Sequence, residues 1–359
     1  MVGLGEGIRP APALMVAGMA GEGTAPLVSV VVPAFNEEAA IEACLDSICG
    51  QDYERLEVIV VDGASTDTTV GRVAAYATKD PRVRLIHNPD RIIPVSLNRA
   101  VEAARGEFLV RVDAHAAIPR DYVSRCVLHL MSGRWCGVGG RKNGVGRTTQ
   151  GRAIAAALAS PFGVGASKYH YGEEPQIVDH VPFGAYPLSI VRQLGGWDER
   201  LAVNQDFEFD FRVRSSGREI LFDPALSIDW ECRQTLRDLW KQYFRYGRGK
   251  AKVVAIHPSS ARLRHLAVPA YVLALLVAFA LAPVSPVVLA AVVSPYVAFL
   301  ATGTLITSRR VGTIGVAVLL PLTFAVMHLA WGLGFLRGIP DGVTVLRVIG
   351  AQSARGATS

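Results

Sequence analysis

A carboxylate and an imidazole stand two residues apart directly after an apolar segment of the chain. The segment FLVRV (108–112) is rich in β-favouring residues, and Asp113 and His115 follow it. Carboxylate oxygens together with one imidazole nitrogen suit Mn²⁺ or Mg²⁺, above all an ion that also binds a diphosphate. Such an ion offsets the negative charge that develops on a phosphate leaving group. The spacing therefore predicts a divalent-metal site at residues 113 and 115.

Polar side chains follow two earlier apolar segments in the same way. Asn36 and Glu37 come after VSVVV (28–32), and Asp62 ends LEVIVVD (56–62). Each alone is more often a helix cap or a turn former than a ligand, and Asp67 in STDTT is expected to be a cap. Their recurrence at successive strand ends favours one shared binding site.

A downstream acidic cluster, Asp206, Glu208 and Asp210, leads into a predicted helix. Asp206 lies on a separate element from the metal site, so it can accept a proton from an incoming hydroxyl group. Glu208 and Asp210 are expected to form a solvated helix face. The Gly- and Arg-rich segment 140–153 predicts a mobile loop that closes over an anionic ligand, or else a plain surface loop. These groups together could transfer a group from a nucleotide diphosphate to an alcohol.

The elements that position these groups alternate between strands and helices. Apolar runs at 27–33, 56–62, 83–88 and 107–116 are separated by segments with helical periodicity, such as 66–78 and 95–106. Strands that are almost continuously apolar and alternate with helices predict an α/β fold with a mostly parallel sheet covered on both faces. Ligands of such sheets bind at the carboxyl ends of the strands.

The bulk composition divides the chain into different regions. Residues 25–255 mix charged and apolar positions, as a globular domain does, whereas 1–24 are Gly-, Ala- and Pro-rich and are expected to be a disordered leader. The five cysteines show no CxxC spacing, which favours reduced thiols and excludes a disulfide framework. The net charge of +6 comes without a nucleic-acid-binding motif, and basic residues gather at 233–264, directly before the apolar region, so we expect no nucleic-acid partner.

Three nearly charge-free stretches follow, at 266–284, 286–306 and 311–336. Each is about long enough to cross the hydrocarbon core of a bilayer, and three together are unusual for core helices of a soluble protein. We expect a membrane region at 256–340 with two to three apolar helices, and a tail at 341–359. Arg309 and Arg310 favour the cytoplasmic side, which leaves open whether the third stretch spans the membrane or is re-entrant.

Four segments in order resemble the motifs of inverting glycosyltransferase family 2. They are VSVVVPAFNEE, VIVVDGASTDTT, VRVDAHA and GGWDERLAVNQDFEFDFRVR, and they cover roughly residues 27–250. Within this family the Asp-Ala-His-Ala form, the segment QYFRYGRGK and the tail HLAWGLGFLRG resemble the ExoA-type succinoglycan glucosyltransferases. The resemblance implies the GT-A fold, a Rossmann-like nucleotide-diphospho-sugar transferase domain.

The resemblance also implies roles for individual residues. Asp206 would be the catalytic base, Asp113 and His115 would hold the metal, and Asp113 would also contact the ribose. Pro33, Asn36, Glu37 and Asp62 would bind the nucleotide sugar. The acceptor or the diphosphate would be contacted by Phe183, Gly184, Ala185, Gly196, Trp197, Asp198, Arg245 and Arg248, although the last two are equally well explained as charges that flank a membrane.

The chain departs from the usual family pattern at three positions. Gly63 stands where a second Asp is usual, Gln205 replaces the Glu that precedes the base, and His115 replaces the second Asp of an Asp-x-Asp motif. A histidine makes the metal site less anionic, and a protonated imidazole cannot bind an ion. The Gln-x-x-Arg-Trp motif of processive synthases is missing from YFRYG, which favours addition of a single sugar.

The function expected from the sequence is a metal-dependent hexosyltransferase at the plasma membrane with a cytoplasmic catalytic domain. It would move glucose from UDP-glucose to a polyprenyl-diphosphate-linked saccharide in exopolysaccharide or cell-surface glycan synthesis. A sugar-nucleotide pyrophosphorylase would need a Gly-rich signature after the first strand, and a dinucleotide oxidoreductase would need G-x-G-x-x-G. PAFNEE is neither. A non-catalytic membrane subunit that binds a nucleotide sugar or a lipid-linked glycan remains the alternative.

Overall fold

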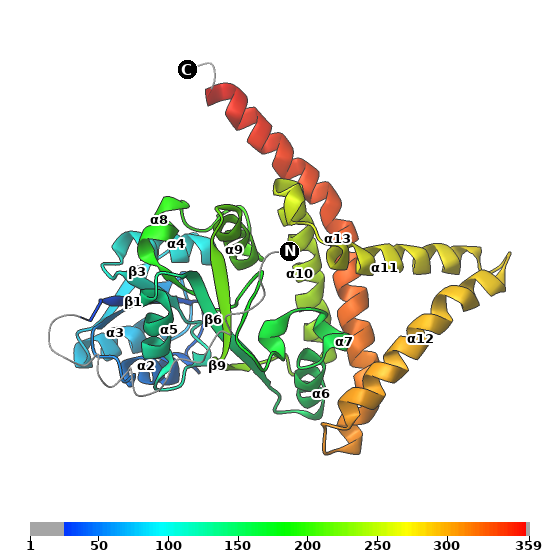
Figure 1. Ribbon diagram of the computed structural model, residues 1–359, viewed down its shortest axis with the longest axis horizontal. Helices are drawn as coiled ribbons and strands as arrows, with labels where there is room; N and C mark the ends of the chain where they lie inside the picture. Colours follow the sequence, from blue (N-terminus) through cyan, green and yellow to red (C-terminus); the bar gives the residue numbers. More distant parts are fainter. Residues whose placement is uncertain (1–24, 357–359) are drawn as a thin grey trace. The chain divides into compact units, whose positions relative to one another are not determined.

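The computed structural model describes residues 25–356 and the side chains up to residue 346 (Figure 1). The expected leader at 1–24 lies outside the described residues. The chain forms two compact units: residues 25–143 with Lys168–Trp230 form the first, and Gly144–Ser167 with 231–356 form the second. The catalytic-domain boundaries 25–255 and the membrane region 256–340 stay predictions.

The first unit is built on a mixed sheet, which has nine strands in the described part of the chain, in the order β3-β2-β1-β4-β8-β6-β9-β5, with β7 paired to β9. Its strands are β1 (Val28–Ala34), β2 (Leu56–Asp62), β3 (Val83–His87), β4 (Phe108–Arg111), β5 (Ala116–Ala117), β6 (Trp135–Val145), β7 (Gln176–Ile177), β8 (Ala185–Pro187) and β9 (Glu219–Glu231). Strands β1 to β4 are parallel, and β8 runs antiparallel to β4 and β6. The predicted α/β class with a mostly parallel sheet is confirmed.

Helices lie against this sheet, most of them through apolar side chains that they bury. They are α2 (Ile41–Cys49), α3 (Thr69–Lys79), α4 (Ile93–Ala103), α5 (Tyr122–Met131), α8 (Leu188–Gln193) and α9 (Gln205–Ser215), with the short 3₁₀ helix η1 (Lys168–His170). Leu97 and Ala100 of α4, for example, are buried against Val31 of β1 and Ile59 of β2. Burial of these side chains stabilises the packing of α4 on the sheet.

Strand register brings the carboxyl ends of the parallel strands to one edge. Ala34 pairs with Asp62, and Asp62 pairs with His87 on the next strand. On the other side of β1, Val31 pairs with Arg111, the last residue of β4. The predicted strand 107–116 therefore ends earlier than expected, and a turn closed by the bond from Ala116 N to Asp113 O (2.9 Å) carries Asp113 and His115.

The segment 140–153 is not the mobile loop that its glycines suggested. Strand β6 continues to Val145, and helix α6 (Thr149–Leu158) begins four residues later. Glycine is needed here because neighbouring backbone is close: a Cβ on Gly140 would stand 1.4 Å from the carbonyl oxygen of Leu226 in β9. The glycines thus allow close strand packing.

The second unit is helical. It contains α6, α7 (Pro161–Val164), α10 (Leu236–Ile256), the 3₁₀ helix η2 (Pro258–Ser260), α11 (Leu263–Leu281), α12 (Pro286–Ser308) and α13 (Ile314–Gly356). Helices α11 and α12 form a V-shaped hairpin whose open side is crossed by α13 (Figure 1). Three segments, Leu263–Leu281, Pro286–Ser308 and Ile314–Leu346, are long and apolar enough to cross a membrane. The three predicted apolar stretches are thus confirmed as helices.

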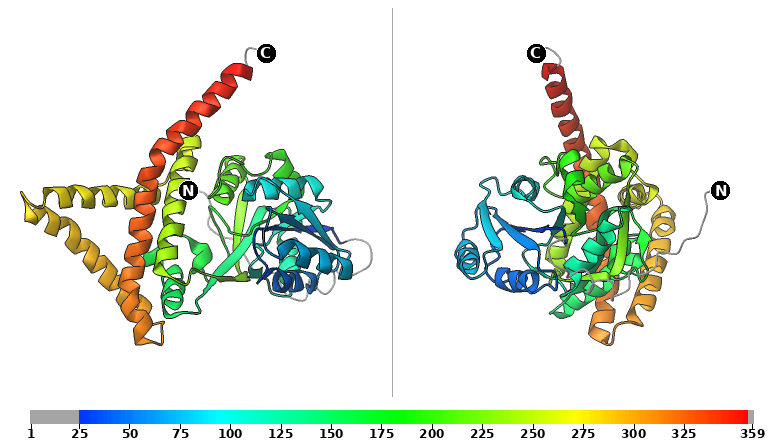
Figure 2. Two further views of the ribbon diagram at one scale, coloured as in Figure 1. Left: turned by 180° about the vertical axis from the view of Figure 1, so that it is seen from behind. Right: turned by 60° about the vertical axis from the view of Figure 1, so that its left-hand side comes forward.

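Helices α10 and α13 lie side by side along much of their length, which both views in Figure 2 show. A Cβ on Gly334 would stand 2.1 Å from the carbonyl oxygen of Phe244, and one on Gly338 would stand 2.5 Å from that of Arg248. The two backbones therefore touch where α13 has no side chain, because glycine lets helix backbones approach closely.

Gly334→Ala is expected to destabilise the second unit by about 2 kcal/mol, because the added methyl group overlaps the backbone of α10. Gly315→Ala on the same helix is the matched control, since the nearest atom to its Cβ is 3.6 Å away. Thermal unfolding of the detergent-solubilised proteins measures the difference. Equal melting temperatures for the two variants would contradict the close packing of α10 on α13.

Candidate functional site

The buried guanidinium of Arg111 joins two carboxylates that come from different elements. Its Nη2 donates to Oδ1 of Asp113 (2.9 Å), its Nε donates to the same oxygen (3.2 Å), and its Nη1 donates to Oδ1 of Asp206. The Arg111 side chain is 5% exposed, and the two carboxylates are 21% and 23% exposed. Burial lowers the pKa of Arg111, but the two negative charges raise it above its ordinary value, so the guanidinium stays charged.

Asp206 lies in the first turn of α9, where its orientation is fixed by the preceding loop. Asn204, the N-cap residue directly before the helix, has a left-handed backbone conformation (φ 60°). The indole Nε1 of Trp197 donates to Oδ1 of Asp206 (3.1 Å), and the Trp197 backbone N–H donates to Asn98 Oδ1 (2.8 Å). Gly196 has φ 70°, a conformation that strains other residues, and so permits this turn.

His115 is held between a carboxylate and an indole. Its Nδ1 lies 2.9 Å from Oε1 of Glu37, and Nε1 of Trp230 donates to its Nε2 (3.2 Å). The hydrogen bond to Glu37 raises the pKa of His115 above its ordinary value. Asp113 behaves in the opposite way: burial raises its pKa, but positive charges beside it, the largest from Arg111, bring the pKa below its ordinary value.

The residues predicted to bind the nucleotide gather where β1 and β2 end. Asp62 accepts hydrogen bonds from the backbone N–H of Ser65 (3.2 and 3.3 Å). Asn36, in a left-handed conformation (φ 54°), accepts from the backbone N–H of Thr66 (2.8 Å). Pro33 pairs with Val61 in the neighbouring strand. These bonds fix the two loops against each other beside Glu37.

The segment Phe183–Ala185, predicted to contact the acceptor or the diphosphate, lies in the same unit. Phe183 has φ 53°, unusual for a bulky residue, and its carbonyl oxygen accepts from the hydroxyl of Tyr122 (3.2 Å). The carbonyl oxygen of Gly184 accepts from the backbone N–H of Arg111 (3.2 Å), and Ala185 pairs with Val110 of β4. The Phe183 ring lies 5.9 Å from the guanidinium carbon of Arg111.

Comparison with known proteins identifies the family. Residues 29–193 match the model of glycosyl transferase family 2. The chain is 32% identical over 323 residues to the succinoglycan biosynthesis protein ExoA of Rhizobium meliloti (strain 1021), which covers 87% of this chain and 94% of that protein. The chain belongs to glycosyltransferase family 2. The resemblance to ExoA-type members of the family, predicted from the motifs, is confirmed.

One further relative and one solved structure are more distant from this family 2 glycosyltransferase. A dolichyl N-acetyl-α-D-glucosaminyl phosphate 3-β-D-2,3-diacetamido-2,3-dideoxy-β-D-glucuronosyltransferase of Methanococcus voltae is 24% identical over 237 residues, which cover 63% of this chain and 74% of that protein. The mannosyltransferase PcManGT from Pyrobaculum calidifontis, solved with GDP-Man and Mn²⁺, superposes with a TM-score of 0.59 over 88% of each chain at 23% identity. The second likeness shows the fold, and the predicted GT-A fold is confirmed.

Three residues of the glycosyltransferase site were missed by the sequence interpretation: Arg111, Lys142 and Trp230. The Nζ of Lys142 lies 3.9 Å from the ring centre of Trp230 and 4.7 Å from that of Phe183. Arg111 stood within the quoted motif VRVDAHA. An arginine in an otherwise apolar buried strand was the available signal, because such a charge is buried only when it is paired.

Glu208 and Asp210 do not form the solvated helix face that was expected. They are 1% and 0% exposed. Asp210 accepts from Tyr186 Oη (2.7 Å) and lies 2.7 Å from Nδ1 of His180, and Glu208 pairs with Arg212 (2.7 Å). Each carboxylate can be buried because another side chain forms a hydrogen bond or an ion pair with it.

The remaining predicted site residues are held in other ways. Asp198 forms an ion pair with Arg200 (2.6 Å) directly after Trp197. Arg245 and Arg248 belong to α10 of the second unit, where Arg248 pairs with Asp341. Their contact with the diphosphate or the acceptor stays a prediction.

The acidic and histidine side chains of the site offer few ligands for a divalent ion. Among the described residues no group of three or more His, Cys, Asp or Glu side chains is arranged to hold a metal. Asp113 fits an ion that takes its other ligands from a diphosphate, whereas His115 fits one only when its Nε2 is released from the indole N–H of Trp230, from which it accepts here. Both bonds from Arg111 go to Oδ1 of Asp113, which leaves Oδ2 for an ion, and Glu37 orients the His115 ring as carboxylates do for metal-binding histidines.

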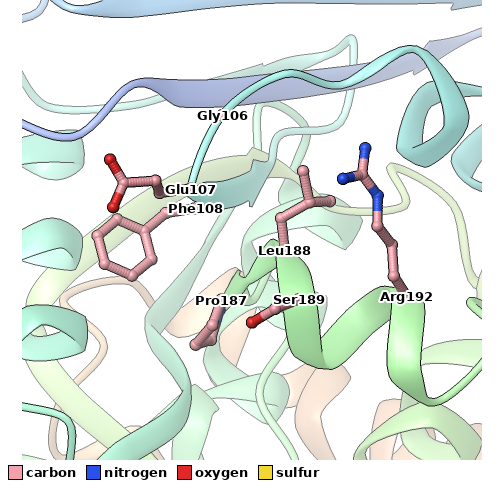
Figure 3. Close-up of a pocket in the computed structure, with 7 residues that line it drawn as sticks. All are labelled: Gly106, Glu107, Phe108, Pro187, Leu188, Ser189 and Arg192. Atoms are coloured by element: carbon pink, nitrogen blue, oxygen red, sulfur yellow. The ribbon is translucent and has the colours of Figure 1, made fainter.

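A cavity of about 330 Å³ lies elsewhere in the first unit, at the amino end of β4 (Figure 3). Its lining includes Phe108, Leu188 and Arg192. The guanidinium of Arg192 donates to the carbonyl oxygens of Val101 (3.2 Å) and Ala104 (2.7 Å), the end of α4. Arg192 thus has a structural role, and the predicted site residues do not line this cavity.

Proposed function

We propose that this family 2 glycosyltransferase moves a hexose, glucose from UDP-glucose, onto a lipid-linked saccharide with inversion at the anomeric carbon. The observation that carries the proposal is the pair of bonds from Arg111, which hold the base Asp206 and the donor-side carboxylate Asp113 on one guanidinium. A base and a donor-binding group so close together can address the same sugar carbon. The relative in succinoglycan biosynthesis supports a role in exopolysaccharide or cell-surface glycan synthesis.

In the proposed mechanism, Asp206 accepts the proton of the acceptor hydroxyl as the oxygen attacks C1 of the sugar. Attack comes from the face opposite the diphosphate, so a new C–O bond forms while the bond to UDP breaks, and the configuration inverts. The bond from Trp197 orients the carboxylate for this step. A divalent ion held by Asp113 and His115 would supply positive charge for the departing diphosphate. Asn36, Glu37 and Asp62 frame the nucleotide beside it.

The proposed acceptor is a polyprenyl-diphosphate sugar, because the second unit suits a membrane surface. Its three apolar helices would anchor the enzyme in the plasma membrane as a multi-pass protein with a cytoplasmic catalytic unit. Helix α13 is continuous from Ile314 to Gly356 but packs along the charged helix α10, which favours a third segment at the membrane surface over one that spans the membrane. Arg309 and Arg310, between α12 and α13, would lie on the cytoplasmic side.

Hydrolysis of nucleotide sugars tests the proposal. Detergent-solubilised protein is expected to release UDP slowly from UDP-glucose in the presence of Mn²⁺ or Mg²⁺, faster than it releases nucleotide from GDP-mannose. EDTA is expected to remove most of this activity, and added Mn²⁺ to restore it. Binding of UDP-glucose without any release of UDP, even when a polyprenyl-diphosphate saccharide is added, would instead support the non-catalytic membrane subunit.

A further inference from the structure

The side chain of Lys142 lies against two aromatic rings in the first unit. Its Nζ lies 3.9 Å from the ring centre of Trp230 on β9 and 4.7 Å from that of Phe183. Both rings are buried, at 7% and 3% exposure. Aromatic faces stabilise an ammonium through the ring quadrupole. The two rings therefore hold Lys142 in place as a cation.

Both rings also belong to the site already described. Trp230 donates its Nε1–H to His115, and Phe183 lies 5.9 Å from the guanidinium carbon of Arg111. The charge of Lys142 contributes to the lowered pKa of Asp113, after the larger effects of burial and Arg111. The ammonium is thus placed beside the groups assigned to the donor and the metal.

The backbone around Lys142 is fixed on both sides. Asn143, the next residue of β6, donates from Nδ2 to Asp229 of β9 (3.2 Å). His170 forms a hydrogen bond with the backbone of Lys142. Burial lowers the pKa of His170 to about 3, so this histidine is neutral and does not compete for an anion. The backbone and the ammonium of Lys142 are both held, so the side chain loses little conformational entropy when a ligand binds.

We infer that Lys142 binds a diphosphate at this site, and that its place beside Asp113 and His115 makes it the protein cation for the donor's leaving group. The inference rests on the proposed function. As the bond from C1 to the β-phosphate oxygen breaks, that oxygen keeps the electron pair, and the ammonium of Lys142 stabilises the new negative charge without transferring a proton. Because His115 replaces an acid at the metal position, a cation from the protein shares the neutralisation of the diphosphate.

The test compares UDP with UMP, which lacks the β-phosphate. Titration calorimetry in EDTA, on the full-length solubilised protein, is expected to show UDP binding weakened about 20-fold in Lys142→Met, with UMP binding changed less than about twofold. Lys142→Arg, which keeps a cation, is expected to retain most of the UDP affinity. Lys79→Met, at an exposed position of the same unit, is the matched control and should leave both affinities unchanged.

Competition with farnesyl diphosphate distinguishes the two sources of a diphosphate. If Lys142→Met weakens the binding of farnesyl diphosphate but not the binding of UDP, Lys142 belongs to a diphosphate site that takes the lipid-linked acceptor. Equal UDP binding and equal farnesyl diphosphate binding by wild type and Lys142→Met would overturn the inference, as would equal losses for UDP and UMP. If Lys142→Met does not fold, Lys142→Gln carries the same expectations.

These outcomes are separable from the failure of the proposed function. A wild-type protein that releases no UDP from any nucleotide sugar would contradict the transferase proposal, yet its UDP and UMP affinities would still report on Lys142. If the wild type and Lys142→Met hydrolyse UDP-glucose at the same rate and bind UDP equally, the transferase proposal stands and Lys142 is removed from it.

Discussion

Asp206→Asn is expected to lower kcat for sugar transfer by about 1,000-fold, the effect of removing a general base. Asparagine keeps the oxygen that accepts from Trp197 Nε1, so the loop before α9 should keep its conformation. What the variant loses is the negative charge that, in the proposed mechanism, accepts the proton of the acceptor hydroxyl. The measurement is the steady-state rate of UDP release with an acceptor present, together with UDP affinity by calorimetry.

UDP affinity should change little in Asp206→Asn, because the residue is assigned to the acceptor side of the reaction. Asp90→Asn is the matched control: it removes an exposed carboxylate in the same unit, 54% exposed and 3.5 Å from Arg99. It is expected to leave the rate unchanged. A rate for Asp206→Asn within about threefold of wild type would refute its assignment as the base.

Arg111→Met is expected to destabilise the first unit by about 3 kcal/mol, because it leaves two partly buried carboxylates without their shared cation. Asp113 and Asp206 would then repel each other, and the loops that carry them would separate. Urea unfolding, followed by tryptophan fluorescence, measures the loss because Trp197 contacts Asp206 directly. Transfer activity should fall along with stability.

The pairing itself is tested by a double-mutant cycle. Arg111→Met combined with Asp206→Asn should be less destabilised than the sum of the single variants, because each alone leaves an unpaired charge. Arg111→Lys keeps the charge but cannot reach both carboxylates with a planar fork, so it should recover only part of the stability. Additive losses in the cycle would show that Arg111 and Asp206 do not interact.

The sequence was sufficient for the parallel strands β1 to β4 of the sheet, but not for β5 to β9. Apolar runs with polar ends, such as the one that closes on Asp62, have a local pattern that reflects strand burial, and this pattern predicted β1 to β4 in order. Asp113 and Asp206 were singled out for their residue types and their motifs, and their roles stay predictions. The structure adds that one guanidinium bonds to both.

The sequence alone could not identify the hydrogen-bond and ion-pair partners that come from distant segments. Glu208 and Asp210 have the charge of a surface helix, and only the positions of Arg212, His180 and Tyr186 explain their burial. The glycines of 140–153 suggested mobility, whereas in the structure Gly140 allows the backbone of β9 to pack closely against β6. Lys142 could not be distinguished from an ordinary surface lysine until its two rings were in place.

The route of the chain between the two units matters for anyone who wishes to purify the catalytic part alone. The chain leaves the first unit at Gly144 and returns at Lys168, and in between α6 and α7 pack on α13, which is synthesised more than 100 residues later. A recombinant fragment that stops at residue 255 would therefore expose the apolar stretch 153–166 and tend to aggregate. Replacing 144–167 by a short polar connector, rather than trimming the C-terminus only, is the more promising route to a soluble fragment.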